Sequence, residues 1–404
     1  MITKNQETPR QAIFSRDEIR QRAEGFSVNS LLKHHAYRNR PLDFETAYLL
    51  GVFALSPYHE SLRGIFDIDP SIVEKQSIAV LCALHNRATY ERKDAAQQIA
   101  GIVAAVFDYD VALSSKGFVK PSVPFVMDNC GMGGDLYRTP NVSTIAALIA
   151  ASDGIPMCKH GSPGNTDSTG SSDFLEFCGM NLRAECDIVE QAVEQFKFSY
   201  TDALDTGYKS VHVQTHKSAR LAHMNDIIGP MTNPVDPTLM TCRVLGVNHL
   251  LDPRMVAEAY HILNLRGMTN VEHALFVRGF VEADRNGGID EVSVFAGGTA
   301  VAELNNGAIK TYDLAPEDFG IPAHTYFKVP EGRLEKARFS RRILEGVIDG
   351  APRDLILANA AILMYLARDI PLKEGYLRAD ELLASGAPLR NLEACVEFTR
   401  RTTP

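Results

Sequence analysis

Two loops rich in glycine and hydroxyl side chains constrain the fold more than any other feature of the sequence. The first, CGMGGDLYRTPNVST at residues 130–144, follows the apolar run at 123–127 and precedes a stretch with helical spacing. The second, KHGSPGNTDSTGSSD at 159–173, follows GIPMC and leads into another helical stretch. Because parallel strands bring their carboxyl ends to one edge of a sheet, both loops are expected at that edge. The pattern predicts an α/β fold.

The rest of the chain suggests two domains, as its length of 404 residues also does. From about residue 15 to 107, apolar side chains recur at three- and four-residue spacing, which predicts a small helical bundle. Further on, short apolar runs alternate with helical segments, which predicts a larger α/β domain with a mostly parallel central sheet. We assign 1–120 to the bundle domain, completed by 187–226. The α/β domain then comprises 121–186 and 227–404.

Composition narrows the class of protein. The net charge of −9 disfavours a nucleic-acid binder, because such proteins neutralise phosphates with basic side chains. No apolar run approaches the length of a membrane span, and the polar N-terminus lacks the apolar stretch of a signal peptide. The seven cysteines form no CxxC pair, which argues against a disulfide framework or a structural zinc site. We expect a cytoplasmic protein with free thiols.

The glycine loop is a candidate phosphate cradle. Without a Cβ, glycines let backbone N–H groups close around an anion, and the first turn of the next helix adds unpaired N–H groups. The alternative is a tight turn with an ordinary helix cap, because the loop matches neither the Walker motif nor the dinucleotide fingerprint. The candidate residues are Gly131, Gly133, Gly134, Asp135, Asn141, Ser143 and Thr144.

Two further stretches would complete a site for a phosphorylated ligand. Lys159 and His160, followed by small hydroxyl donors, suit a polyanion, although a flexible polar surface loop is the alternative. Asp290 and Glu291 stand at the start of EVSVF, which is expected to form a strand. Such a carboxylate pair suits Mg²⁺, which takes one or two carboxylates together with waters and substrate phosphates. The alternative is a pair of solvated acids.

A basic run around residues 212–223 is the last candidate. On a helix, several of its side chains would share one face, which could clamp an anionic substrate or bind a metal through His212 and His216. A solvated cationic face is the alternative. The run contains His212, His216, Lys217, Arg220 and His223.

Taken in order along the last 280 or so residues, these motifs resemble the anthranilate phosphoribosyltransferase family. The family's GTGGD and N-x-S-T motifs correspond to CGMGGD and NVST. Its KHG loop and S-G-S-x-D-x-L-E segment correspond to KHG and TGSSDFLE, and its LGPLTNP to IGPMTNP at 228–234. Its D-E-x-S motif corresponds to DEVS at 290–293. The closing EDFG and LANAAILMYLA segments are similar to that family's last segments.

The resemblance implies a glycosyltransferase of the pentosyltransferase type, which in this family acts in tryptophan biosynthesis. It implies a homodimer through the helical domain, an active site between the domains, 5-phosphoribosyl-1-pyrophosphate as donor, and Mg²⁺. Asp290 and Glu291 would hold the metal, with Ser143 assisting. The implied donor-binding residues are Gly131, Gly133, Gly134, Asp135, Asn141, Ser143, Thr144, Lys159, Gly161 and Ser171.

The acceptor side departs from the family pattern. The KHG motif continues with Ser162-Pro163 instead of Asn-Arg, and the family's His-Pro pair falls near Thr206-Gly207. The arginine that would meet the anthranilate carboxylate aligns near His216, whose neighbour is Lys217, and neither residue offers a bidentate fork. Met132 replaces a threonine, and the N-terminal segment is longer than the family pattern. The implied acceptor-binding residues are His160, Ser162, His216, Lys217, Gly229 and Pro230.

Three alternatives to an anthranilate-specific enzyme follow. One is a paralogue that acts on another aromatic or heterocyclic acceptor, including a reaction like that of nucleoside phosphorylases. A second is a non-catalytic nucleic-acid-binding relative, against which the acidic net charge and the acid pair argue. A third is a binder of phosphorylated metabolites, for which the sequence offers no positive feature.

Overall fold

The computed structural model describes residues 12–111, 117–164, 170–202, 208–212, 214–215 and 221–401. Its N-terminal region is helical, as predicted, and a mixed, mostly parallel seven-stranded sheet follows. The N-terminal helices are α1 (Arg16–Ala23), α2 (Val28–His34), η1 (Ala36–Arg38), α3 (Phe44–Leu55), η2 (Glu60–Leu62), α4 (Pro70–Ala83), α5 (Arg87–Tyr90), α6 (Ala95–Val106) and η3 (Phe107–Val111).

The starts of these helices carry the sequence signals that begin a helix. Ser15 and Glu18 form a reciprocal capping box at the start of α1, which satisfies two backbone N–H groups. Asp69 accepts from the Ser71 N–H at the start of α4, where Pro70 occupies the first turn. The pair α3 and α6 packs closely at the centre, because Gly101 lets the two backbones approach. A Cβ at that position would overlap the Phe44 carbonyl.

The sheet has the strand order β3-β2-β1-β4-β5-β6-β7. The first five strands are parallel, whereas β6 and β7 add an antiparallel edge. Because the chain moves outward from β1 to β3 and then returns to β4, the order reverses between β1 and β4, where open α/β sheets bind ligands. The strands are β1 (Met127–Gly131), β2 (Met157–Gly161), β3 (Phe198–Asp202), β4 (Cys242–Gly246), β5 (His273–Gly279), β6 (Thr299–Asn305) and β7 (Ala308–Leu314).

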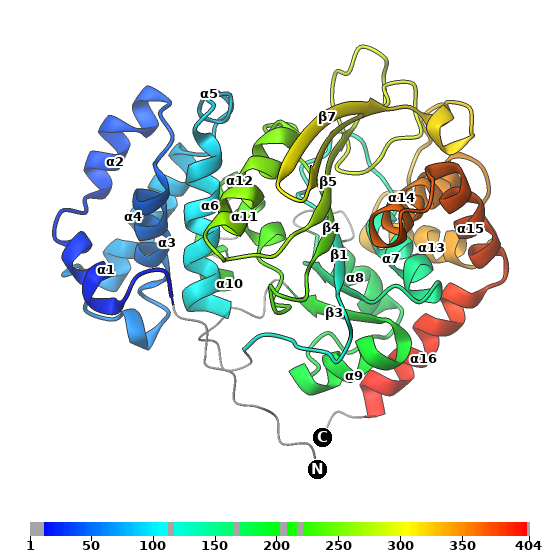
Figure 1. Ribbon diagram of the computed structural model, residues 1–404, viewed down its shortest axis with the longest axis horizontal. Coiled ribbons are helices and arrows are strands. Elements are labelled where there is room, and N and C mark those ends of the chain that lie inside the picture. The colour runs from blue at the N-terminus through cyan, green and yellow to red at the C-terminus, as the bar shows by residue number, and fades with distance from the viewer. Residues whose placement is uncertain are drawn as a thin grey trace.

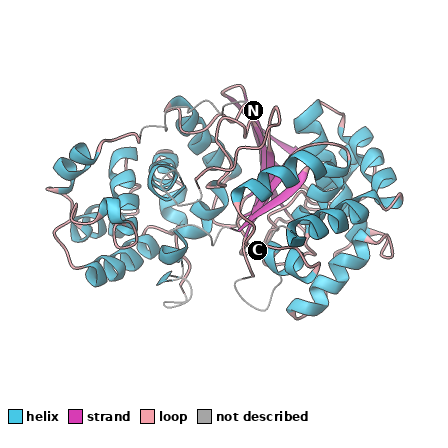
Figure 2. Ribbon diagram, turned by 90° about the horizontal axis from the view of Figure 1, so that it is seen from below, coloured by secondary structure: helices cyan, strands magenta, loops and turns pink. Residues whose placement is uncertain are grey.

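Helices cover both faces of the sheet (Figures 1 and 2). On one side, α12 lies between the sheet and α6 of the N-terminal region. On the other side, α7 packs against α14, which in turn packs against α15. The remaining helices are α7 (Val142–Ser152), α8 (Ser171–Phe177), α9 (Cys186–Phe196), α10 (Tyr208–His212), α11 (Asn225–Met231), α12 (Pro253–Leu265), η5 (Pro316–Phe319), α13 (Arg333–Leu344), α14 (Ala351–Arg368), α15 (Leu372–Ala384) and α16 (Ala387–Arg401).

The segment 187–226, assigned above to the helical bundle, contacts both regions of the molecule. In its first part, β3 is an edge strand of the sheet, and α9 packs on β3 and α16. Its second part lies nearer the bundle, where α10 contacts α3 and α11 contacts α6. One hydrophobic core extends from the bundle helices through α12 to the sheet, so the packing is continuous across the predicted boundary.

Two predicted strands also differ in the structure. Of the apolar run at 123–127, only Met127 belongs to β1, which begins there and includes Cys130 and Gly131 of the glycine loop. EVSVF forms no regular strand, and only Phe295 makes an isolated bridge there. The segment instead crosses the sheet edge, where the Asn359 side chain bonds both backbone groups of Val292. β3 and β4 were not predicted.

Two further properties bear on the class of protein. Within the described ranges, no single helix is long and apolar enough to cross a membrane; α14 and α15 pass that test only as a pair bent by 116°. All seven cysteines lie among the described residues, and none of them forms a disulfide.

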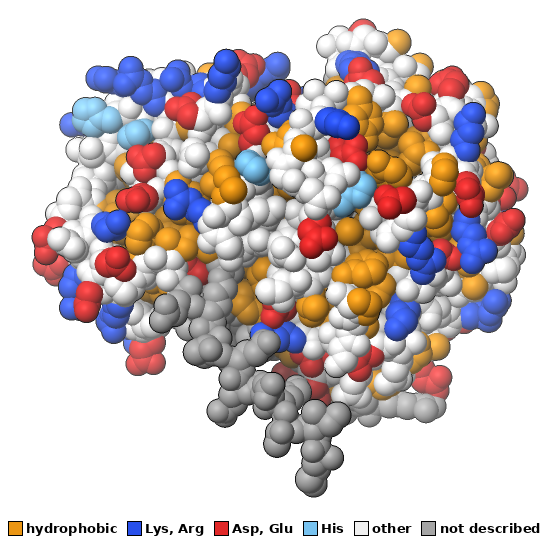
Figure 3. Space-filling model, in the orientation of Figure 1, with side chains coloured by type: hydrophobic (Ala, Val, Ile, Leu, Met, Phe, Trp, Pro, Cys, Tyr) orange, Lys and Arg blue, Asp and Glu red, His pale blue; other side chains and the backbone are white. Residues whose placement is uncertain are grey.

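On the face shown in Figure 3, basic side chains gather along the edge formed by the N-terminal helices, and over the rest of that face both signs of charge are interspersed.

Candidate active site

Asp290 lies at the point where the strand order reverses. Gly131 and Gly246 are register partners at the ends of β1 and β4. A Cβ on Gly131 would overlap the Asp290 carboxylate, and a Cβ on Gly246 would overlap the Asp290 backbone. The absence of both side chains therefore lets the acid segment lie directly on the carboxyl ends of the two strands. The role of Gly246 was missed, although a glycine directly after the apolar run of β4 was a usable signal.

The glycine loop and the acid pair are in direct contact. Gly133 and Gly134 have φ values of 72° and 84°, which favour glycine. The Gly133 N–H donates to Asp290 Oδ2 at 2.7 Å. One carboxylate oxygen each of Asp135, Asp290 and Glu291 lies within 4.8 Å of the other two. The structure thus brings together residues from two motifs that are far apart in the sequence.

The electrostatics of this acid cluster favour a cation. Burial, together with the charge of Asp290, raises the pKa of Glu291 well above its ordinary value, and the same two causes raise the pKa of Asp135. Thr139 Oγ1 donates to Glu291 Oε1 at 3.2 Å, whereas no described residue hydrogen-bonds the buried Oε2. Burial and mutual repulsion destabilise the ionised form of these carboxylates, and a bound metal ion would offset that cost. The residues therefore fit Mg²⁺.

Helix α13 contributes a lysine that the sequence did not single out. Lys336 interacts electrostatically with Glu291, Asp290 and Asp135; burial lowers its pKa, and these acidic charges oppose that shift. On the same helix face, the Ser340 hydroxyl donates to Asn141 Oδ1 at 2.9 Å, and Arg333 donates to the Gly164 carbonyl at 2.9 Å. This face of α13 therefore packs against both loops. No motif at this position signalled the role.

Hydrogen bonds with β1 and with the second loop fix the start of α7. Asn141 precedes the helix, and its side chain donates to the Gly170 carbonyl at 3.1 Å, which joins the two loops. Asn129 on β1 donates to the Ser143 carbonyl at 2.8 Å. Ser143 is partly exposed, and the Thr144 hydroxyl is buried with no hydrogen-bond partner among the described residues.

The second loop begins inside β2, not after it. Lys159 is buried, and its ammonium donates to the Asn129 carbonyl at 2.7 Å. Burial lowers its pKa, and nearby negative charges oppose the shift. Gly161 lets Ser171 and Tyr200 approach, because a Cβ there would lie 2.8 Å from each side chain. The Ser162 carbonyl accepts from the Ser172 N–H at 3.3 Å.

A buried ion pair supports the residues predicted for the acceptor. Arg243 Nη2 lies 3.0 Å from Asp128 Oδ2 and donates to the Pro230 carbonyl at 2.8 Å. The other Asp128 oxygen accepts from the His160 N–H at 3.0 Å. Burial lowers the pKa of His160 to about 4, so this imidazole is neutral near pH 7. Gly229 and Pro230 lie in α11. Neither Asp128 nor Arg243 was predicted.

Only some of the residues predicted around 206–223 are described. Thr206, Gly207, His216 and Lys217 lie outside the described residues. His212 ends α10 and His223 precedes α11, so the described residues do not form the single helix expected over 212–223.

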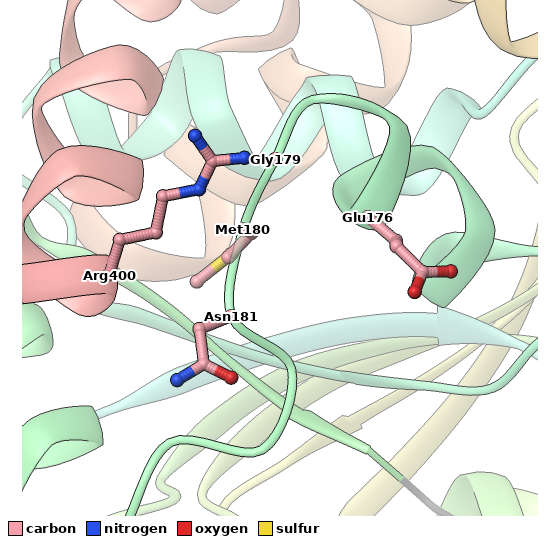
Figure 4. Close-up of a pocket in the computed structure, with 5 residues that line it drawn as sticks. All are labelled: Glu176, Gly179, Met180, Asn181 and Arg400. Atoms are coloured by element: carbon pink, nitrogen blue, oxygen red, sulfur yellow. The ribbon is translucent and has the colours of Figure 1, made fainter. Parts of the chain in front are cut away.

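A hollow of about 290 Å³ lies at a separate place, between the turn after α8 and the end of α16 (Figure 4). In the close-up, Arg400 projects from α16 toward Gly179 and Met180. The hollow is lined by Glu176, Gly179, Met180, Asn181 and Arg400. Only Glu176 belongs to a predicted motif, as the last residue of TGSSDFLE, and none of the five is a candidate site residue. The predicted chemistry-bearing side chains are at the sheet edge, so the candidate active site is there and not at this hollow.

Comparison with known proteins relates the chain to one family of enzymes. Residues 124–389 match the model of the glycosyl transferase family, a/b domain. The chain is 34% identical over 286 residues to anthranilate phosphoribosyltransferase of Symbiobacterium thermophilum, covering 69% of this chain and 78% of that protein. The fold matches the anthranilate phosphoribosyltransferase structure from Thermus thermophilus with a TM-score of 0.69 and 25% identity, over 92% of this chain and 99% of that one.

A second structure, that of the Saccharomyces cerevisiae enzyme in complex with PRPP and Mg, matches with a TM-score of 0.70 and 25% identity, over 89% of this chain and 94% of that one. The fold and the site together define a glycosyl transferase with a helical N-terminal region. More narrowly, the chain belongs to the anthranilate phosphoribosyltransferase family.

Proposed function

We propose that this protein is a Mg²⁺-dependent phosphoribosyltransferase that moves phosphoribosyl from 5-phosphoribosyl-1-pyrophosphate to an aromatic amine, anthranilate or an analogue. The observation that carries the proposal is the position of Asp290, on the ends of β1 and β4 and bonded to the glycine loop. Family membership and the yeast relative's complex with PRPP and Mg support it.

The donor would bind along the glycine loop and the first turn of α7. Backbone N–H groups of that turn and the hydroxyls of Ser143 and Thr144 would meet phosphate oxygens, and Asp135 would meet the ribose or the metal. Gly161 and Ser171 would line the same side of the site. The Gly133 N–H now donates to Asp290, so this N–H becomes available to phosphate only if Asp290 turns toward a cation.

The metal would be held by Asp290 and Glu291, with Ser143 assisting. When bound, Mg²⁺ would neutralise charge on the departing pyrophosphate. Lys336 lies close enough to the three acids to interact with them, so it adds a fixed positive charge on the α13 side of the site. Lys159, whose ammonium is bonded to the Asn129 carbonyl, would act mainly by its charge beneath the strand ends.

In the reaction, the acceptor nitrogen forms a bond to the anomeric carbon as the bond to pyrophosphate breaks, and the nitrogen then loses a proton to solvent. No protein nucleophile is needed, so the chain acts by positioning and by stabilising charge. His160 is neutral and would donate or accept a hydrogen bond at the acceptor, not supply a cation. His216 and Lys217 would have to supply any positive charge that an acceptor carboxylate requires.

The same proposal includes the assembly, the domain roles and the location. The helical region would form a homodimer interface, the α/β domain would bind the donor, and the enzyme would act in the cytoplasm. The seven cysteines, none of them in a disulfide, and the resemblance to a family of biosynthetic enzymes support that location.

The test is a pyrophosphate-release assay with Mg²⁺, the donor and a panel of aromatic amines and heterocycles. We expect release with anthranilate or an analogue, and none without Mg²⁺. If another acceptor reacts and anthranilate does not, the acceptor assignment is wrong and the donor assignment stands. If no acceptor releases pyrophosphate and calorimetry detects no donor binding, the proposed function is wrong.

A further inference from the structure

A second cluster of metal-ligating side chains lies outside the proposed active site. His212 ends α10, His223 lies just before α11, and Asp226 is in the first turn of α11. One ligand atom of each residue lies within 4.8 Å of the other two. The sequence suggested His212 with His216 as a metal pair; His216 lies outside the described residues, and among those described His212 lies with His223 and Asp226.

The geometry within the cluster suits a shared ion. Asp226 Oδ2 accepts from the His223 backbone N–H at 3.3 Å, while Asp226 Oδ1 lies 3.9 Å from His223 Nδ1. Two ligands at about 2.1 Å from one ion can be up to about 4.2 Å apart, so this pair is within reach of a single ion. The rings of His212 and His223 meet edge to face, with their centroids 5.3 Å apart. The backbone bond orients the carboxylate, as hydrogen bonds commonly do for metal ligands.

We propose that His212, His223 and Asp226 form a binding site for a divalent transition-metal ion such as Zn²⁺. Two imidazoles and one carboxylate suit Zn²⁺ and its first-row neighbours, whereas Mg²⁺ prefers oxygen ligands alone. The site therefore differs in ion preference from the all-carboxylate cluster of Asp135, Asp290 and Glu291. It does not depend on the proposed transferase reaction.

The position of the site suggests what the ion does. It joins the end of α10 to the start of α11, and α11 carries Gly229 and Pro230. The neighbouring Met224 N–H donates to the Leu81 carbonyl of α4 at 3.4 Å, so this segment also rests on the N-terminal helices. A bound ion would fix α11 between the two regions and act structurally, not in the chemistry.

The test measures Zn²⁺ binding to the full chain by equilibrium dialysis in excess Mg²⁺, which occupies the oxygen-ligand site. We expect His212→Gln and Asp226→Asn each to weaken binding of one Zn²⁺ per chain by at least about tenfold. His212 is only partly buried, so its substitution spares the core, whereas His223 is fully buried. His34→Gln, on the exposed end of α2, is the matched control and should bind Zn²⁺ as the wild type does.

Thermal unfolding gives a second readout. Zn²⁺ should raise the Tm of the wild type and of the Asp290→Asn, Glu291→Gln double variant, but not that of His212→Gln. A ligand that binds only the folded state raises the Tm, and His212→Gln lacks one of the proposed ligands. Two results would overturn the proposal: a wild type that retains no Zn²⁺ in excess Mg²⁺, or equal Zn²⁺ affinity in His212→Gln and the wild type. Loss of the Zn²⁺ effect in the Asp290, Glu291 double variant would assign the ion to the proposed active site instead.

Discussion

At the scale of single residues, the candidate site depends on two glycines, because a Cβ at either position would overlap Asp290. The sequence singled out Gly131 and Asp290 separately, from a glycine-rich loop and an acid pair. It did not show that Gly131 and Gly246 are partners across β1 and β4, or that one aspartate occupies the space above both. Such proximity is set by the register between strands that are more than a hundred residues apart, which no local pattern encodes.

Gly131→Ala tests this close approach. The added Cβ overlaps the Asp290 carboxylate, so the carboxylate must shift, and misplacing a catalytic group by about 1 Å costs on the order of 100-fold in rate. We expect kcat/KM for the donor to fall by about that factor with the circular dichroism spectrum unchanged. Gly25→Ala, where a Cβ meets no atom within 4 Å, is the control. Full activity in Gly131→Ala would show that Asp290 has no role at this position.

The raised pKa of Glu291 predicts that the free energy of unfolding depends on pH. Its pKa is raised above the ordinary value of 4.5, so the folded protein binds this proton more tightly than the unfolded chain. The contribution of Glu291 to the unfolding free energy therefore falls as pH rises above 4.5, until pH passes the folded pKa. Without metal, Glu291→Gln should be more stable than the wild type at pH 8, by about 1–3 kcal/mol, and the difference should shrink towards pH 5.

Chemical denaturation in chelator at the two pH values measures this difference. Added Mg²⁺ should stabilise the wild type more at pH 8 than at pH 5, because the ionised carboxylate is the ligand, and should stabilise Glu291→Gln less. A wild-type-minus-variant difference that does not change with pH would contradict the raised pKa of Glu291.

At the scale of elements, local patterns predicted helices better than strands. The helices around Phe44–Leu55 and Val142–Ser152 follow from apolar spacing. EVSVF was expected to be a strand because its apolar residues alternate, but its backbone is bonded by Asn359 and by the Thr299 hydroxyl instead of by a neighbouring strand. β4 was missed because CRVLG includes Arg243, whose buried charge is paired only in the folded sheet. In both segments, contacts with residues distant in the sequence override the local pattern.

The role of α13 gives an element-scale prediction. Lys336 partly neutralises the acid cluster, so Lys336→Met should leave excess negative charge where we propose that the pyrophosphate of the donor binds. We expect the Kd for 5-phosphoribosyl-1-pyrophosphate, measured by calorimetry in Mg²⁺, to rise about tenfold, which corresponds to about 1.4 kcal/mol. Lys310→Met on the exposed edge strand β7 is the matched control. An unchanged Kd in Lys336→Met would remove α13 from the donor site.

At the scale of the whole molecule, the sequence predicted the two kinds of architecture but not how they join. The helical N-terminal region and the mostly parallel sheet were both expected. The hydrophobic core nevertheless continues from α3 and α6 through α12 to the sheet, so the two regions share one packed interior. β3 was not predicted, because the apolar spacing over 187–202 is typical of a helix. A single edge strand of five residues adds little periodic signal of its own.

The central claim is that the acid cluster and the glycine loop form one metal-dependent site for the donor. Calorimetric titration of 5-phosphoribosyl-1-pyrophosphate into the full chain tests it, with Mg²⁺ or with chelator, for the wild type and for the Asp290→Asn, Glu291→Gln double variant. We predict one donor bound per chain in Mg²⁺, and no measurable binding in chelator or by the folded double variant. Equal donor affinity with and without Mg²⁺, or in the wild type and the double variant, would contradict the claim.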